Sequence, residues 1–271
     1  MANKSDFIVA YDVKRVSFPT PKQSANALFN FMRQRKFLEK ILYNKAIFPR
    51  YVEEIIDYLE LPNLTSIAFP MTCFCDINLS RIEWHAKKYG TYGIAFHKIW
   101  GIENHIQPIQ YITKGSILEH DFRTAFMESV YYRSKSTTRD NRTDYLLSHL
   151  AFMKQLIGKN TSFSTNQYYF HDEREWRYIP NLSNIDTELP SFLVGKTNNA
   201  TSRKYHSDGM KLCNEAWLKF DWKDIKYIVT PNRQAKENIL DYIRHNIIAS
   251  EKEKYTLVSK VIRLDELKED I

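Results

Sequence analysis

FHDEREWRYIP, at residues 170–180, is the stretch on which the interpretation of this sequence depends. In a β-strand side chains alternate between two faces, so Glu173, Glu175 and Arg177 would share one face. The aromatic residues in and before the stretch, and the Pro-Asn dipeptide after it, favour a strand over the short helix that Pro180 would still allow. The sequence therefore predicts two carboxylates side by side on one strand.

Two functions are open to this carboxylate pair. In a reaction at an anomeric carbon, one carboxylate can stabilise the positive charge that develops on a sugar ring while the other orients or deprotonates the acceptor. The alternative is a ladder of ion pairs in which Glu173 and Glu175 meet Arg174 and Arg177. The residues alone do not decide between chemistry and structure.

The composition predicts a folded protein with a basic amino end. Hydrophobic residues make up 43% of the 271 residues and aromatic residues 14%, which argues against disorder. The formal net charge is +7. Residues 1–50 contain ten Lys or Arg and three acidic residues, so the net charge of the remaining residues is zero. A basic region favours a polyanion such as nucleic acid, or an acidic protein, as partner, although it can also serve solubility alone.

Several classes of protein are disfavoured by what the sequence lacks. Cys73, Cys75 and Cys213 are too few for a disulfide framework, and neither a signal-like stretch nor an 18-residue apolar window occurs, so we expect a cytoplasmic protein without a membrane segment. The phosphate-binding patterns G-x-G-x-x-G and G-x-x-x-x-G-K do not occur, so any nucleotide would be held in another way. No cluster has metal-ligand spacing, and we expect no metal site.

The order of predicted elements is α+β, without the regular alternation of a doubly wound fold. We predict one domain over residues 1–271, with 181–210 as a long loop and the 108–113 strand paired to the 94–99 strand. The predicted strands are 27–32, 68–76, 94–99, 108–113, 225–230 and 256–264. The predicted helices are 33–44, 52–59, 79–88, 122–132, 145–157 and 232–248. Residues 133–142 are interpreted as a basic linker.

Six stretches together resemble one known family. They are LFNFM at 28–32, KAIFPRYVEE at 45–54, CFCDINLS at 73–80, KYGTYGIAFHKIWGI at 88–102, DEREWRYIP at 172–180 and IKYIVTP at 225–231. They resemble the AbiGi-type abortive-infection proteins of bacterial anti-phage systems, which in turn look related to ADP-ribosyltransferase toxins such as DarT and CmdT. The resemblance implies a split mixed β-sheet with flanking helices that holds NAD without a glycine-rich loop.

The same resemblance implies roles for individual residues. Glu175 would be the catalytic carboxylate, Glu173 would orient the acceptor, and Tyr92 would pack on the nicotinamide. Asn30 stands where many members of that fold have His or Arg. The residues implied to bind NAD are Asn30, Arg50, Tyr51, Phe74 and Tyr89.

Two functions follow from the resemblance. The first is an NAD-dependent ADP-ribosyltransferase toxin that modifies nucleic acid, with RNA or single-stranded DNA as acceptor and an inhibitory antitoxin protein as partner. The alternative is a catalytically silent antitoxin, or a regulatory binding protein, of an abortive-infection system.

Overall fold

The computed structural model describes residues 24–135, 141–159 and 167–267, and its centre is a mixed sheet built around one long strand. That strand, β4 (Ser66–Cys75), is almost entirely buried, as its near-continuous apolar sequence SIAFPMTCFC requires. The sheet order is β15 (Val261–Arg263), β14 (Ile225–Thr230), β5 (Tyr92–His97), β1 (Ala27–Met32), β4, β11 (Glu175–Tyr178) and β6 (Gln107–Pro108). Only β14 and β15 run parallel within this order. The predicted α+β class with a mixed sheet and flanking helices is confirmed.

Strand β4 pairs with different strands along its two halves. Its first six residues pair with β3 (Arg50–Ile55), and β12 (Leu193–Val194) pairs with it at Ile67 and Ala68. Its last four residues pair with β11, with Glu175 opposite Cys75 and Tyr178 opposite Thr72. The carboxylate-bearing strand therefore lies beside the most buried strand of the sheet.

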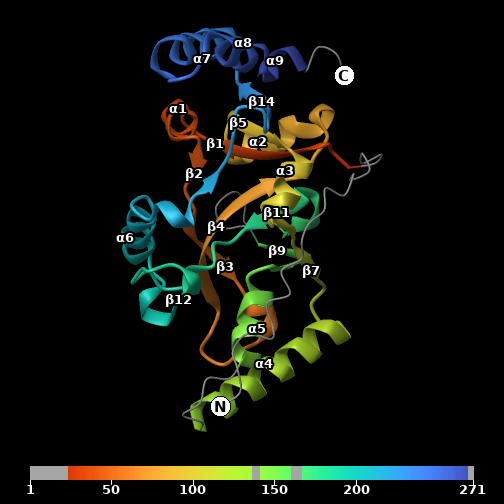
Figure 1. The fold of residues 1–271 in the computed structure, drawn as a ribbon. Coiled ribbons are helices and arrows are strands. Elements are labelled where there is room, and N and C mark those ends of the chain that lie inside the picture. Colours follow the sequence, from red (N-terminus) through yellow and green to blue (C-terminus); the bar gives the residue numbers. More distant parts are fainter. Residues whose placement is uncertain (1–23, 136–140, 160–166, 268–271) are drawn as a thin grey trace.

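Helices cover both faces of the sheet (Figure 1). On the face that carries Phe74 and Trp176, apolar residues of four helices join the largest core: α1 (Arg35–Asn44), α3 (Lys98–Glu103), α7 (Arg233–Asn246) and α8 (Glu251–Ser259). On the other face lie α2 (Ile82–Tyr89), α4 (Ile117–Lys135), α5 (Asn141–Leu150) and α9 (Leu264–Leu267). In Figure 1, α4 and α5 form one end of the molecule, and α7 and α8 form the other.

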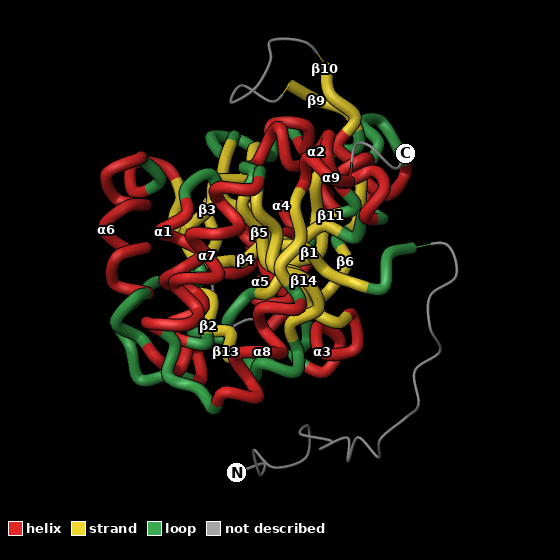
Figure 2. Tube along the Cα trace, turned by 90° about the horizontal axis from the view of Figure 1, so that it is seen from above, coloured by secondary structure: helices red, strands yellow, loops and turns green. Residues whose placement is uncertain are grey.

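Shorter elements complete the fold. Three two-stranded sheets are formed by β2 (Ala46–Ile47) with β13 (Leu218–Lys219), β7 (Gln110–Ile112) with β8 (Met153–Gln155), and β9 (Ile157–Lys159) with β10 (Gln167–Tyr169). Figure 2 shows β9 and β10 projecting from the body of the protein. The 3₁₀ turns are η1 (Asp57–Leu59), η2 (Leu79–Arg81), η3 (Phe170–Glu173), η4 (Leu182–Asn184), η5 (Gly195–Thr197) and η6 (Asn214–Ala216). No helix among the described residues is both long enough and apolar enough to cross a bilayer.

The structure corrects three predicted elements. Residues 52–59 form a strand followed by η1, because pairing with β4 satisfies their backbone in extended form. The predicted helix 145–157 ends at Leu150, because β8 begins at Met153 and pairs with β7. Of the predicted strand 256–264, residues 256–259 are the end of helix α8 and residues 261–263 form strand β15. The helix begins with a reciprocal cap between Ser250 and Glu253.

Two further predictions fail through partners that the sequence does not show. The predicted 181–210 loop contains α6 (Ala200–Met210), in which the Asn199 side chain accepts a hydrogen bond from the Ser202 amide. The predicted strand 108–113 is divided between β6 and β7, which pair with β11 and β8 and not with β5. Two predicted basic regions lie partly outside the described residues. These parts are residues 1–23 of the amino end and residues 136–140 of the linker.

Shortening a fully buried side chain of β14 should destabilise the protein strongly. Ile228→Ala removes apolar volume from the core between β14 and α7, so we expect the free energy of unfolding to fall by about 2–5 kcal/mol. The matched control is Ile248→Ala, which shortens a largely exposed isoleucine and should change stability by less than about 0.5 kcal/mol. Urea unfolding of both variants measures the difference, and equal losses would contradict the placement of this core.

Candidate functional site

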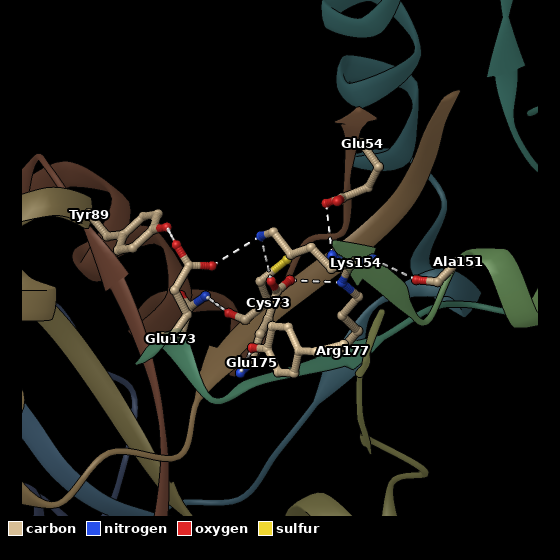
Figure 3. Close-up of polar contacts among 10 residues, drawn as sticks. Glu54, Cys73, Tyr89, Ala151, Lys154, Glu173, Glu175 and Arg177 are labelled. Carbon is tan, nitrogen blue, oxygen red and sulfur yellow. Dashed lines mark hydrogen bonds and ion pairs between the residues drawn. The ribbon is translucent and has the colours of Figure 1, made fainter. Parts of the chain in front are cut away.

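Five charged side chains meet on the sheet face that carries Cys73 and Cys75, and we call them the charge cluster (Figure 3). They come from four separate segments of the chain: β3, β8, η3 and β11. The members are Glu54, Lys154, Glu173, Glu175 and Arg177. Residues far apart in the sequence are thus brought to one place by the sheet.

Every charge in the cluster has an ionic partner. The Lys154 Nζ lies 3.0 Å from Glu173 Oε2 and 2.8 Å from Glu175 Oε2. The Arg177 Nε lies 2.7 Å from Glu175 Oε1, and its Nη2 lies 2.9 Å from Glu54 Oε1. Arg177 Nη1 also donates to the Ala151 carbonyl at 2.7 Å. The guanidinium therefore joins β11 to β3 and to the chain that follows α5.

The cluster is buried from solvent. Arg177 has 0% of its surface exposed and Glu175 has 7%. Three carboxylates face two cations, and the hydroxyl of Tyr89 on α2 donates to the other oxygen of Glu173. Burying unpaired charges would cost several kcal/mol each, so the mutual pairing is what makes this arrangement possible.

The backbone turns between the two glutamates. Glu173 belongs to η3, and Arg174 takes a left-handed conformation, with φ of 42°, before β11 begins. The Asp76 amide donates to the Arg174 carbonyl, and the Glu175 amide donates to the Tyr111 hydroxyl, both of which hold the turn. The predicted single strand across residues 170–180 is therefore wrong for 170–173. The two carboxylates are close because both form ion pairs with Lys154, and not because they alternate along one strand.

The electrostatics keep Glu175 ionised. Burial alone would favour the neutral acid, but the charges and hydrogen bonds of Arg177 and Lys154 hold the pKa of Glu175 well below its usual range. Nearby on α2, burial lowers the pKa of His85 to about 4, so its imidazole is neutral near pH 7. A carboxylate that is ionised at all ordinary pH values and held by two cations is a poor general acid or base. The arrangement is suited to joining segments of the fold.

The structure brings some of the predicted site residues together and separates others. Glu173, Glu175 and Tyr89 meet in the charge cluster. Asn30, Phe74 and Tyr92 lie on the opposite face of the sheet. The register shows this, because Glu175 is opposite Cys75, Cys75 is opposite Phe29, and Phe29 is opposite Ala95, so these four share one face. Each of the other three residues lies an odd number of positions along its strand from one of these four: Asn30 from Phe29, Phe74 from Cys75 and Tyr92 from Ala95. An odd spacing on a strand places a side chain on the opposite face of the sheet.

The remaining predicted residues lie on β3. Arg50 is exposed, while the Tyr51 hydroxyl donates to the Pro190 carbonyl and its ring packs on His206. Tyr51 therefore packs against the segment around α6 and not against the charge cluster. The residues predicted to hold NAD are thus distributed over both faces of the sheet.

Sequence reasoning missed two members of the cluster. Lys154 lies within the predicted helix 145–157 and Glu54 within the predicted helix 52–59, so the sequence does not indicate either as a partner of Glu175. The ion pair between Glu175 and Arg177 had a sequence signal, which is their i, i+2 spacing on a strand. Among the described residues, no three His, Cys, Asp or Glu side chains are grouped as ligands for a metal ion.

Fold and site together define an α+β protein in which a mixed sheet is tied to its surroundings by a buried ionic network. The chain belongs to the AbiGi family: the family model described as "Putative abortive phage resistance protein AbiGi, antitoxin" matches residues 45–231. The chain is also 31% identical over 250 residues to the abortive phage resistance protein AbiGi of Lactococcus lactis subsp. cremoris, covering 83% of this chain and 99% of that protein. No solved structure matches the chain.

These findings correct the first of the two predicted functions. The prediction of an ADP-ribosyltransferase toxin is wrong, because the family to which the chain belongs is described as an antitoxin. NAD as substrate and RNA or single-stranded DNA as acceptor were inferred from that activity and stay predictions. The family resemblance and the association with abortive infection are confirmed.

Removing the arginine at the centre of the cluster should destabilise the fold. Arg177→Met leaves Glu54 and Glu175 buried without their guanidinium partner, so we expect a loss of about 3–5 kcal/mol in the free energy of unfolding. The matched control is Arg233→Met, which breaks an exposed pair with Glu237 on α7 and should cost less than about 1 kcal/mol. Both are measured by denaturant unfolding at pH 7, and similar losses would show that the buried network contributes little.

Acid should weaken the cluster through Glu175. Its pKa in the folded protein is below the unfolded value, so the unfolded state binds the proton first and stability falls as the pH drops below about 5. Glu175→Gln removes this titration, and we expect its free energy of unfolding to fall less than that of the wild type between about pH 5 and pH 3. Unfolding curves at several pH values measure both slopes. Identical slopes would mean that Glu175 is not held ionised by the cluster.

Proposed function

We propose that this chain is a catalytically silent antitoxin, or regulatory component, of an abortive phage-resistance system, and that it acts by binding a partner protein. The observation that carries the proposal is the family match over residues 45–231, whose description includes the word antitoxin. All five members of the charge cluster lie within those residues. The proposal thus concerns the same part of the chain that the cluster holds together.

The geometry of the cluster supports a role without catalysis. Both glutamates that could serve sugar chemistry are occupied by Lys154, and Glu175 is also held by Arg177. A substrate would have to displace buried ion pairs before it could reach either carboxylate. In a binding protein the same ion pairs would hold the fold rigid, and a surface that is already rigid loses less conformational entropy when it binds.

Growth rescue tests this function. The chain is co-expressed with the growth-arresting protein of the same defence system, and we expect the wild type to restore growth because it binds and neutralises that protein. We also expect Glu175→Gln to restore growth in proportion to the fraction that is folded at the growth temperature, measured in parallel by thermal unfolding.

Two results would contradict the proposal. If the wild-type chain did not restore growth at equal expression, it would not be an antitoxin for that protein. If Glu175→Gln were fully folded and yet failed to restore growth, the carboxylate would have a chemical role, and the silent interpretation would be wrong.

A further inference from the structure

The outer side of helix α1 combines exposed cations with exposed aromatic rings. Its apolar side is buried in the main core. The opposite side presents four residues at spacings of three, four and seven, which places them on one helix surface: Lys36, Phe37, Lys40 and Tyr43. We call these four residues the α1 face. Phe37 is 47% exposed and Tyr43 is 61% exposed, so cations and accessible rings alternate along the helix.

Lys40 extends this surface to a second pair of rings. Its Nζ lies 5.0 Å from the centre of the Phe48 ring, a cation–π distance. Phe48 in turn packs edge-to-face on Trp217, with 4.6 Å between the ring centres, and both side chains are partly exposed. The aromatic surface therefore continues past the end of the helix.

The two lysines of the α1 face have no acidic partner in the part of the chain that the structure describes. No carboxylate there lies within ion-pair distance of Lys36 or Lys40. The one acid of the helix, Glu39, pairs with Arg35 at 2.9 Å. Both ammonium groups are therefore available to an anion from outside the protein.

The elements packed against α1 leave the local charge positive. Strands β1, β2 and β5 contribute no acidic residue. Helix α7, which lies beside α1 (Figure 1), contributes three cations and two acids, namely Arg233, Lys236, Arg244, Glu237 and Asp241. Together α1 and α7 hold six Lys or Arg and three acids, a net charge of +3. Nearby, η6 and β13 add one acid and one lysine, and Lys45 pairs with Asp221 at 3.0 Å.

The α1 face also lies in the segment that carries most of the charge of the whole chain. Residues 24–50 contain six Lys or Arg and one acid, so +5 of the net charge of +7 belongs to this described part of the basic amino end. A charge concentrated on one short segment attracts a polyanion over a longer distance than scattered charges do. The partner of this face is therefore expected to be strongly negative.

A single-stranded nucleic acid matches both components of the α1 face. Each nucleotide offers a phosphate to a cation and a base to an aromatic ring, and sites for single strands combine these two features. Lys36 and Lys40 are about 6 Å apart along the helix axis, so they can contact successive phosphates while the two rings stack on bases. A duplex would engage the lysines alone, because its bases are already stacked on one another. An acidic protein surface has no such regular alternation of charges and flat rings.

We propose that the α1 face binds single-stranded nucleic acid, through phosphate contacts of Lys36 and Lys40 and base stacking on Phe37 and Tyr43. This is a second binding activity, which does not depend on the proposed antitoxin function. Its contacts are to backbone and to base faces, so the binding tolerates many sequences and is shared by RNA and single-stranded DNA.

The first pair of variants tests the phosphate contacts. Lys36→Ala with Lys40→Ala removes both ammonium groups from the α1 face. The matched control, Lys159→Ala with Lys196→Ala, removes two exposed lysines of β9 and η5 and changes the net charge of the protein by the same amount. The comparison therefore separates local charge from total charge.

The second pair of variants tests base stacking. Phe37→Ala and Tyr43→Ala each truncate one ring of the α1 face. The controls are Tyr145→Ala on α5 and Tyr205→Ala on α6, whose side chains are 66% and 74% exposed. Alanine suits a helix at all four positions, so we expect these variants to remain folded at the assay temperature, as thermal unfolding will verify.

The purified full chain is titrated into labelled oligouridylate and oligothymidylate of about 15 nucleotides, and into a duplex of the same length, between about 50 and about 200 mM salt. We expect the wild type to bind both single strands. The lysine variant should lower the slope of log Kd against log salt by about 1.4, which corresponds to two phosphate contacts. Each ring variant should bind at least about fivefold more weakly, and all controls should stay within about twofold of wild type.

Four other results would overturn the inference. The first is a wild-type chain that binds neither single strand at the lower salt concentration. The second is equal binding by the α1 variants and their controls, which would place the contacts elsewhere. The third is equal binding of the duplex together with ring variants that behave as wild type, which would exclude stacking. The fourth is a set of α1 variants that keep oligonucleotide binding but lose growth rescue, which would make this face a protein interface. Growth rescue by the wild type tests the antitoxin function separately, so either activity can fail alone.

Discussion

The guanidinium of Arg177 has no exposed surface, so its charge must be balanced inside the protein. It meets this requirement by taking a carboxylate from its own strand, a carboxylate from β3 and the backbone carbonyl that follows α5. An unpaired buried charge would cost several kcal/mol, so moving any one of these segments away from the guanidinium would be unfavourable. Besides the backbone pairing of β11 with β4 and β6, one buried side chain therefore connects β11 to β3 and to the segment after α5.

The same pairing engages both glutamates that the sequence singles out. Sugar chemistry needs one carboxylate that faces the reacting carbon and another that can exchange a proton or orient an acceptor. In this protein Lys154 lies between Glu173 and Glu175, and Arg177 holds the second oxygen of Glu175. The opposite face of the sheet carries Tyr92, the residue expected beside a nicotinamide, which packs against the main core. One sheet thus separates the residues that a dinucleotide site would have to combine.

Local patterns predicted the elements whose environment agrees with their composition. The strands 27–32 and 225–230 coincide with β1 and β14, and the predicted helices 33–44 and 232–248 contain α1 and α7. The predictions failed where a non-local partner decided the backbone. Residues 52–59 have apolar spacing suited to a helix but are extended, because β4 offers hydrogen bonds along their length. Residues 153–155 continue a helical pattern, yet they pair with β7, which brings Lys154 to the two glutamates.

The sequence by itself determined the α+β class, the family and the presence of a carboxylate pair beside an arginine, because each of these is expressed in the order and spacing of nearby residues. Only the tertiary structure decided what that pair does. Glu54 and Lys154 are separated by a hundred residues and were assigned to helices, so the complete neutralisation of Glu175 could not be seen before the sheet assembled them. Whether a carboxylate is reactive depends on its partners and its exposure, and both are set by packing between distant segments.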